Sequence, residues 1–336
     1  MSTPEGSTSV GLGSRGEVCA ASGRFIAGDW GSSFMRLYLC EVGASVRVLD
    51  TVNGPGIKFC DDPEAAFFSA AGRWLEREGL LPVVLAGMVG SNVGWIDCPY
   101  AQCPASLDDL AARMTRFEAR GVPIAIVPGI SCTNIFGLPD VTRGEEAQIF
   151  GWLAGAAGEG RRTLCLPGTH AKWCSVGGAR VTRFFTSMTG EMFEILVAHS
   201  LVGRGMAPVT LDSTIAAGDP AFVRGVETAL AGAQLAFEHA VFSARSLLVT
   251  GDLSPESARP YLSGLLIGCE VRDAITALAA AGEPVDHVTL IGAPALSPLY
   301  AAVLDGLGIA YAMADVHAAS LAGLAALAGH AQRVPA

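Results

Sequence analysis

The sequence predicts an α/β protein divided into two lobes. The chain has 336 residues, whereas a single hydrophobic core usually stops growing at about 250–300 residues. A polar, glycine-rich segment at 155–162, "GAAGEGRR", is the best candidate for a linker. On each side of it, strands alternate with helices after an opening hairpin. We therefore expect a flexible lead over 1–23, a first lobe over 24–156 and a second over 157–336, with the last helix packing back on the first lobe.

The first half predicts the element order βββαβαβα. The hairpin "RFIA"–"FMRLYL" and the strand "SVRVLDTV" form an antiparallel meander. Asp62 and Pro63 indicate a helix start, because an acidic residue caps a helix and proline suits its first position. Ser106 indicates a second start. The apolar face of that helix would contain Leu107, Leu110, Met114 and Phe117. Buried strands "LPVVLAG" and "VPIAIVPG" and a helix over 144–154 complete this half.

The second half restarts the same pattern. Strands "TLCL", "WCSV" and "RVTRFFT" form a second meander. Helices are expected from about Asp219, Ser257 and Leu296, interleaved with strands "SLLVTG", "HVTLIG" and "IAYAMA". The two halves share a pattern of elements rather than a repeated sequence.

Composition excludes several classes of protein. The net charge of −10 argues against a nucleic-acid-binding surface, and no apolar run is long enough to span a membrane. The N-terminus lacks the apolar core of a signal peptide. The nine cysteines contain no CxxC pair, which predicts reduced thiols and a cytoplasmic protein.

A first candidate phosphate site is the turn "GDWGSS". Gly31, Ser32 and Ser33 offer backbone amides and hydroxyls to phosphate oxygens. Asp29, at the strand end, is suited to Mg²⁺, directly or through water, because Mg²⁺ favours a carboxylate plus phosphates. The alternative is an ordinary polar hairpin turn.

The turn "LPGTHAKW" is a second candidate of the same kind. Gly168 and Thr169 offer a close-approach backbone and a hydroxyl, and Lys172 adds a cation. His170 and Cys174 have a metal-like spacing, but they are expected on a turn and a strand rather than at a metal site.

Three further segments carry polar groups suited to a substrate. Glu145 and Glu146 lie at a helix start, where the helix dipole favours acids even without a function. The loop "GMVGSNVGWIDCPYAQCP" follows a buried strand and is long enough to form a polyol-binding wall. Its candidate side chains are Ser91, Asn92, Trp95 and Asp97. The segment "FFTSMTGEMFEIL" places Thr186, Ser187, Thr189 and Glu191 on the rim of the second half.

Together these segments resemble the sugar-kinase, actin and Hsp70 superfamily, and more narrowly the 2-dehydro-3-deoxygalactonokinase family. The resemblance extends from about Phe25 to Leu327. It is carried by "AGDWGSSFMRLY", "GMVGSNVGWIDCPYAQCPA", "TRGEEAQIFGWL", "LPGTHAKW", "FFTSMTGEMFEIL", "SGLLIGCEVRDA" and "LIGAPALSPLYAAVLDGLGI".

The resemblance implies two RNase H-like (actin-like ATPase) lobes around a nucleotide cleft. It also implies ATP-dependent, Mg²⁺-assisted phosphorylation of the terminal hydroxyl of 2-dehydro-3-deoxy-D-galactonate, and a possible homodimer. The turns at 29–33 and 168–172 would bind the ATP phosphates. The adenosine turn would contain Gly292, Ala293 and Ser297. The sugar-acid site would contain Gly87, Ser91, Asn92, Trp95, Asp97, Arg143, Thr189 and Glu191.

The base that removes the hydroxyl proton has four candidates. Asp29 is better placed to serve the metal, and Asp97 could instead position the substrate. Glu145 and Glu146 point about 100° apart on a helix, so only one can face the cleft. We choose Glu145 as the base, with Glu146 and Asp97 left open.

Two alternatives keep part of this interpretation. An exopolyphosphatase-like hydrolase would use a glutamate near "GEEA" to activate water, and a sensor would bind ATP and a sugar acid without turnover. A dehydrogenase of the Rossmann type is disfavoured because no G-x-G-x-x-G follows the first strand.

Overall fold

The computed structural model describes residues 9–10, 23–43, 46–156, 160–208, 214–231 and 236–331. Most of the expected flexible lead lies outside these ranges, although Ser9–Val10 form a short strand, β1, paired with β4. Three residues of the expected linker, 157–159, also lie outside them.

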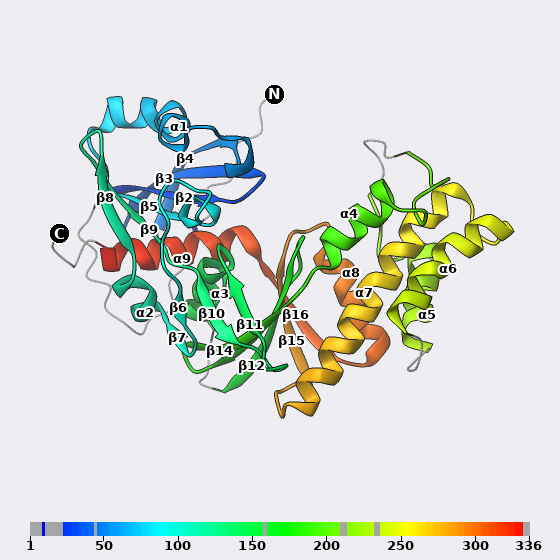
Figure 1. Ribbon diagram of the computed structural model, residues 1–336. Helices are drawn as coiled ribbons and strands as arrows, with labels where there is room; N and C mark the ends of the chain where they lie inside the picture. The colour runs from blue at the N-terminus through cyan, green and yellow to red at the C-terminus, as the bar shows by residue number, and fades with distance from the viewer. Residues whose placement is uncertain are drawn as a thin grey trace, which may run out of the picture.

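The first lobe is a seven-stranded sheet in the order β1-β4-β3-β2-β5-β9-β8. Its β2, β3 and β4 form an antiparallel meander, and β5 and β9 continue the sheet parallel to β2. The strands are β2 (Arg24–Trp30), β3 (Phe34–Val42), β4 (Val46–Pro55), β5 (Val83–Ala86), β8 (Thr115–Ala119) and β9 (Val122–Ile126). Helix α1 (Pro63–Glu78) covers one face, and α9 (Val316–Ala331) lies on the opposite face (Figure 1).

The second lobe repeats this topology. Its six-stranded sheet has the order β16-β15-β12-β13-β14-β7. The strands are β7 (Ala105–Ser106), β12 (Arg161–Leu166), β13 (Ala171–Gly177), β14 (Arg180–Ser187), β15 (His287–Gly292) and β16 (Ala310–Asp315). In both sheets a three-strand meander is followed by two strands that add on the far side of its first strand, parallel to it. This shared 3-2-1-4-5 order is the RNase H-like arrangement, so the predicted fold is confirmed.

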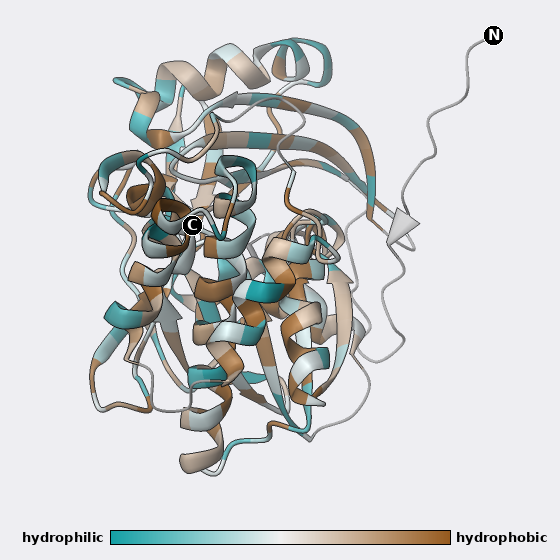
Figure 2. Ribbon diagram, turned by 90° about the vertical axis from the view of Figure 1, so that its right-hand side faces the viewer, coloured by the Kyte–Doolittle hydropathy of each residue, from teal (hydrophilic) through white to brown (hydrophobic). Residues whose placement is uncertain are grey.

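Helices form a thick layer over the second sheet (Figure 1). They are α4 (Thr189–His199), α5 (Pro220–Ala231), α6 (Phe237–Thr250), α7 (Pro255–Ala280) and α8 (Ser297–Leu307). Hydrophobic and hydrophilic residues alternate along these helices (Figure 2). That pattern is typical of helices that bury one face.

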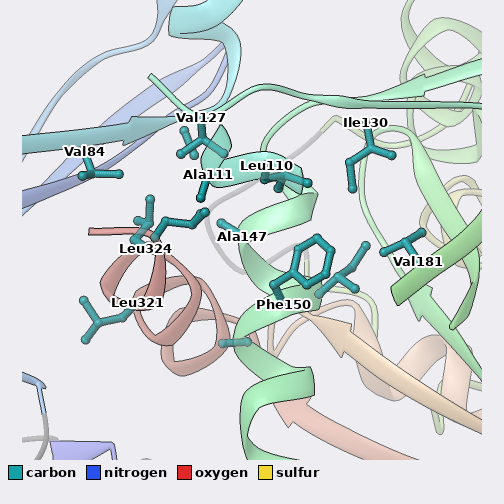
Figure 3. Close-up of a cluster of buried hydrophobic side chains, with 14 of the residues drawn as sticks. Val84, Leu110, Ala111, Val127, Ile130, Ala147, Phe150, Val181, Leu321 and Leu324 are labelled. Carbon is teal, nitrogen blue, oxygen red and sulfur yellow. The ribbon is translucent and has the colours of Figure 1, made fainter. Parts of the chain in front are cut away.

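Helices α3 (Glu145–Gly155) and α9 pack against each other between the lobes. A Cβ on Gly151 would overlap the carbonyl oxygen of Ala319, and a Cβ on Gly323 would overlap that of Ala147. The two glycines therefore let the helix backbones touch. Figure 3 shows side chains of both helices in one buried cluster with β5 of the first sheet.

Two segments join the lobes across the proposed boundary at residue 156, and the second of them is the last helix, which we expected to pack back on the first lobe. Strand β7, from the first half, joins the second sheet through β14, while α9, at the end of the chain, lies against β2 and β5. The first half also contains a small three-stranded sheet of β6 (Ala101–Gln102), β10 (Ile130–Thr133) and β11 (Pro139–Thr142). The sequence patterns did not predict this sheet.

Two predicted elements are wrong. The segment 246–251, "SLLVTG", is not a strand, since α6 includes it up to Thr250. The helix capped by Ser106 is only α2 (Leu107–Ala112), and Phe117 belongs to β8. Positive φ angles at Arg120 and Gly121, 50° and 80°, turn β8 back onto β9, as a tight hairpin turn requires.

Among the described residues, no helix combines the length and apolar character needed to cross a membrane. The apolar run 320–328, which could have paired subunits, instead belongs to α9 and packs inside the protomer.

Candidate active site

Asp29 lies near the carboxyl end of β2, the central strand of the first sheet. In the sheet register it is paired with Arg36 of β3 on one side and with Ala86 of β5 on the other. Its neighbour Trp30 is fully buried. Because successive side chains of a strand point to opposite faces, Asp29 points to the face that α3 and α9 cover.

Two glycines bring the start of α3 to the same place. Gly87 follows β5 with a φ of 98°, and a Cβ there would lie 2.7 Å from the carbonyl oxygen of Trp30. Gly144, with a φ of 110°, packs against the Cα of Gly87. The next residue is Glu145, so the first turn of α3 lies beside the end of β2.

The carboxylates of this site differ in their surroundings. Burial, and then the negative charge of Glu145, raise the pKa of Asp29 to about 6, while Arg36 lowers it. Glu145 is partly exposed, and its Oε2 accepts hydrogen bonds from the Thr142 hydroxyl at 2.6 Å and the Arg143 amide at 3.2 Å. Its charge also raises the pKa of Cys174 in β13. Glu145 therefore lies where the two lobes meet.

Glu146, by contrast, is fully buried. Its Oε2 accepts a hydrogen bond from the Gly144 amide at 2.6 Å, and its Oε1 has no partner among the described residues. Burial and the charge of Glu145 raise the pKa of Glu146 to about 8. Glu146 is therefore a neutral, inward-facing acid at pH 7.

Arg36 is a site residue that the sequence patterns did not identify. It lies beside Asp29, and its Nη1 donates a hydrogen bond of 2.8 Å to Nδ1 of His317 near the start of α9. The contact joins the first sheet to the last helix. The register of the β2–β3 hairpin could have revealed Arg36, because it places the residue seven positions after Asp29 directly opposite Asp29.

The loop after β5 divides into side chains that hold its shape and side chains that face solvent. The Ser91 hydroxyl donates to the carbonyl of Met88 at 2.7 Å. Asn92 and Asp97 are exposed. The Trp95 ring packs against the rings of Phe67 and Phe117. The structure therefore does not bring Trp95 to the carboxylate site.

Arg143 connects this loop to the start of α3. Its Nη2 donates to the carbonyl of Cys98 at 2.7 Å, and its guanidinium lies 4.4 Å from the centre of the Tyr100 ring. Its Nε and Nη1 are buried and have no partner among the described residues. It is thus a partly unsatisfied cation directly behind the loop.

The second predicted phosphate turn lies between β12 and β13. Thr169 and His170 are exposed, and a Cβ on Gly190 of α4 would lie 2.6 Å from the carbonyl oxygen of Gly168. The Glu191 amide donates to the Thr169 carbonyl at 3.0 Å, and Nε2 of His170 lies 2.6 Å from Oε2 of Glu191. The first turn of α4 therefore packs directly on this turn.

Lys172 does not face that turn. It is buried, and its Nζ donates to the carbonyl of Val141 at 3.1 Å and to the hydroxyl of Thr186 at 2.7 Å. Thr186 in turn donates to Asp140 at 2.7 Å from its hydroxyl and at 2.9 Å from its amide. In this arrangement the lysine joins β11 to β14, and it would have to leave both partners to reach a phosphate.

A cavity of about 340 Å³ opens beside Gly168. Its lining comes from the start of α4, from α7, and from the turn and helix after β15. The lining residues are Gly168, Thr189, Gly190, Phe193, Thr214, Ile215, Ser263, Leu266, Ile267, Ala295, Leu296, Leu299 and Tyr300. Mostly apolar walls with a few hydroxyls and a glycine turn at one end are typical of a small-molecule site.

The predicted adenosine turn borders this cavity, but not through Gly292, Ala293 or Ser297, the residues that we expected to bind adenosine. Ala295 and Leu296 line it, whereas Gly292 and Ser297 are buried and Ala293 is exposed outside it. A Cβ on Gly292 would lie 2.7 Å from the Ser297 hydroxyl. Gly292 therefore lets the turn close against the start of α8.

Comparison with known proteins identifies the family. A model of the family described as "2-keto-3-deoxy-galactonokinase" matches residues 29–327. The chain belongs to the 2-keto-3-deoxy-galactonokinase family. The two glycine turns, the carboxylate site and the cavity all lie within the matched residues 29–327.

Three individual proteins agree with this membership. The 2-dehydro-3-deoxygalactonokinase of Escherichia coli (strain K12) is 33% identical over 288 residues, which is 85% of this chain and 90% of that protein. A protein of Rhizobium meliloti (strain 1021) named "Probable 2-dehydro-3-deoxygalactonokinase" is 34% identical over 314 residues, 91% of this chain and 97% of its own. A crystal structure from Sinorhizobium meliloti, given the same enzyme name provisionally, superposes with a TM-score of 0.79 at 34% identity and covers 90% of this chain and 98% of that one.

Proposed function

We propose that this protein is an ATP-dependent kinase that phosphorylates the terminal (6-) hydroxyl of 2-dehydro-3-deoxy-D-galactonate. The observation that carries the proposal is the meeting of Asp29 and Glu145 at the boundary of two RNase H-like lobes, in a chain of this family. Phosphoryl transfer needs alignment and charge stabilisation more than covalent chemistry from the protein, and these are what the site provides.

The nucleotide would occupy the cavity beside Gly168. The apolar side chains of α7 and α8 suit the faces of an adenine ring, while Ser263 and Thr189 offer hydroxyls. The phosphates would lie toward the Gly168 turn and the first turn of α4, because amides at a helix N-terminus favour anions. Gly31, Ser32 and Ser33 offer a similar turn on the first lobe.

Mg²⁺ fits the donor set at Asp29. Asp29 is a carboxylate whose pKa is raised first by burial and then by the charge of Glu145, and a carboxylate with phosphates completing the shell is a ligand set that Mg²⁺ prefers. Asp29 would hold the ion, directly or through water. The bound ion would offset negative charge on the ATP phosphates, and Arg36 supplies a permanent positive charge at the same place.

Glu145 is the residue proposed to accept the proton of the sugar hydroxyl. It is partly exposed beside Asp29, whereas Glu146 is buried and protonated at pH 7. Oε2 of Glu145 is held by Thr142 and Arg143, which fixes the direction of the carboxylate. A base held in this way has a defined orientation before the substrate binds.

The sugar acid would lie against the loop that follows β5. Gly87, Ser91, Asn92 and Asp97 belong to this loop. Arg143, behind it, is a cation suited to the substrate carboxylate, since a guanidinium can bind a carboxylate through two parallel hydrogen bonds. Nε and Nη1 would become available to the substrate if the loop shifts on binding.

A coupled ATP-consumption assay tests the proposal. The purified protein would be supplied with ATP, Mg²⁺ and either 2-dehydro-3-deoxy-D-galactonate or its gluconate epimer, with the phosphorylated product identified by mass spectrometry. We expect ADP formation that depends on the galactonate-derived acid and yields one phosphorylated sugar acid per ATP. ADP release without a sugar acid, or ATP binding without any turnover, would contradict it.

Location and assembly remain predictions. A cytoplasmic protein fits the eight free cysteines among the described residues. A homodimer would have to use a surface other than the 320–328 run, which is buried.

A further inference from the structure

Glu270 is a buried carboxylate in the middle of α7. Its side chain accepts a hydrogen bond from Nε1 of Trp173 at 2.8 Å and another from the hydroxyl of Tyr300 at 2.8 Å. Burial raises the pKa of Glu270, and the side chains of Thr189, Trp173 and Tyr300, as hydrogen-bonding neighbours, act against that rise. No Lys, Arg or His of the described residues forms an ion pair with it. A buried charge without a cation is unfavourable, so its presence calls for a physical reason.

Two of these three neighbours line the nucleotide cavity. Thr189 is the first residue of α4 and Tyr300 belongs to α8, and both line the cavity. Trp173 follows the Gly168 turn on β13. Glu270 does not line this cavity and borders a neighbouring one. It can therefore act on the nucleotide only through its partners.

Thr189, the neighbour of Glu270, is adjacent in sequence to Gly190, which packs on the proposed phosphate site. Helix α4 begins without a side-chain cap, so its first amides remain suited to an anion. Gly190, next to Thr189, packs on the Gly168 carbonyl and on Thr169. Any displacement of Thr189 would therefore move the first turn of α4 against the Gly168 turn.

We propose that Glu270 is a positioning residue for ATP: it holds the start of α4 and the α8 wall at the separation that the nucleotide requires. This inference rests on the proposed kinase function. A carboxyl group suits the role because its two oxygens can accept hydrogen bonds from several converging donors at once. A glutamine has one oxygen, and its NH₂ group would face a donor.

Glu270→Gln tests the proposal because it preserves shape and removes the charge. We expect the Kd of a non-hydrolysable ATP analogue, measured by calorimetry, and the KM for ATP to rise by roughly tenfold, since a hydrogen bond to a charged group is lost or misdirected. The KM for the sugar acid should change less than the KM for ATP, because the loop after β5 and Arg143, which would hold most of the sugar acid, belong to the first lobe. The Tm should stay close to that of wild type, because glutamine preserves the shape of the side chain.

Glu283→Gln is a matched control. Glu283 is also a buried carboxylate, shortly after α7, but it pairs with Arg161 at 2.6 Å and Arg183 at 3.5 Å and does not line the nucleotide cavity. This variant should lower the Tm and leave the Kd of the analogue unchanged. The contrast separates positioning of the nucleotide from general stabilisation.

A double-mutant cycle with Thr189→Val shows whether Glu270 acts through Thr189. Valine keeps the shape and removes the hydroxyl. We expect the effect of Glu270→Gln on the Kd to shrink markedly in the Thr189→Val background. If Glu270→Gln does not fold, Thr189→Val and Tyr300→Phe should each still raise the Kd, and Tyr300→Phe should do so at an unchanged KM for the sugar acid.

Three results would overturn the proposal: wild-type Kd in Glu270→Gln, additive effects in the cycle, or a Tm that falls together with both KM values. A wild-type protein that binds no ATP analogue would instead reject the kinase function, and this inference with it.

Discussion

Asp29 and Glu145 lie together although one ends a strand near the start of the chain and the other begins a helix near its middle. Burial of Asp29 and the charge of Glu145 raise the pKa of Asp29 to about 6. The folded protein therefore holds this proton more tightly than the unfolded chain does. A buried carboxylate whose charge is disfavoured by a second carboxylate beside it is a combination expected at a functional site rather than in a stable core.

The first prediction concerns stability. The pKa of Asp29 is about 3.8 in the unfolded chain and about 6 in the folded protein. Between these two pH values the unfolded chain binds fewer protons than the folded protein, so the folded protein loses stability as the pH rises. The loss is complete above about pH 6 and absent below about pH 3.8. At about pH 7.5, Asp29→Asn should increase the free energy of unfolding by at most about 3 kcal/mol, and the Tm should rise accordingly. Near pH 4 the Tm of the two proteins should coincide. Thermal unfolding at both pH values checks this, and equal Tm differences at both would contradict it.

The same substitution should also separate turnover from substrate binding. Asp29→Asn removes the carboxylate proposed to hold Mg²⁺, so kcat should fall by at least about 10²-fold at every Mg²⁺ concentration. Binding of the sugar acid, followed by calorimetry, should be nearly unchanged. A near-normal kcat would remove Asp29 from the catalytic site.

Glu145→Gln and Glu146→Gln form a matched pair on adjacent residues. Glu145→Gln should lower kcat by about 10²–10⁴-fold, the usual contribution of a positioned base, with ATP binding retained. Glu146→Gln should stay active at pH 7, because Glu146 has a pKa of about 8 and is already uncharged there. Between about pH 4.5 and pH 8 the unfolded chain has lost the proton of Glu146 while the folded protein still holds it, so wild type loses stability across this range and Glu146→Gln should become the more stable protein as the pH rises.

Steady-state kinetics and thermal unfolding of these two variants, with Asp97→Asn as a third, check the assignment. An active Glu145→Gln beside an inactive Glu146→Gln or Asp97→Asn would show that we have chosen the wrong base.

Arg36→Gln should affect both turnover and its pH dependence. Arg36 lowers the pKa of Asp29, so its loss should move the acid limit of kcat/KM to higher pH. Loss of a cation beside the phosphates should lower kcat by about 10–10²-fold. His317→Gln is the control, because His317 is exposed and, among the described residues, its hydrogen bond is to the guanidinium of Arg36, and its effect should be below about threefold. An unchanged pH profile in Arg36→Gln would contradict the coupling to Asp29.

Gly151→Ala tests the close crossing of α3 and α9. The added methyl would overlap the Ala319 carbonyl, and overpacking of this kind typically destabilises a protein by about 1–3 kcal/mol. Gly155→Ala, in the same helix with no atom within 4 Å of the added methyl, should be neutral or slightly stabilising. Chemical denaturation of both variants checks the difference. Equal stability of the two would mean that the helices can separate without loss.

Short-range signals in the sequence determined much of the secondary structure. The Asp62 cap of α1 is present, with its side chain accepting from the Ala65 amide at 3.0 Å, and so are both opening meanders. Caps and hairpin turns involve residues only a few positions apart, so the sequence specifies them locally. The family, too, could be inferred from contiguous motifs.

Short apolar runs were the least informative signal. "SLLVTG" suits a strand or one face of a helix equally well, because a few residues cannot show the period. Its place in α6 was decided by packing, as Ala240, Val241 and Ala244 of that helix face a buried cluster with α7. The β8 strand was likewise decided by its pairing with β9.

The candidate site depended most on tertiary structure. The sequence placed Glu145 and Glu146 side by side, and only the packing of α3 against the first sheet and α9 decided that Glu146 is buried while Glu145 meets Asp29. Lys172 was predicted from its position near a turn, yet its side chain follows the strand and bonds to Thr186. Glu270 carried no local signal, since its three partners lie on elements far apart in the sequence. Contacts of this kind depend on how distant strands and helices are brought together, and no neighbouring residue encodes that. The local structure could therefore be predicted from the sequence. The charges and partners of the site residues were decided by the tertiary structure.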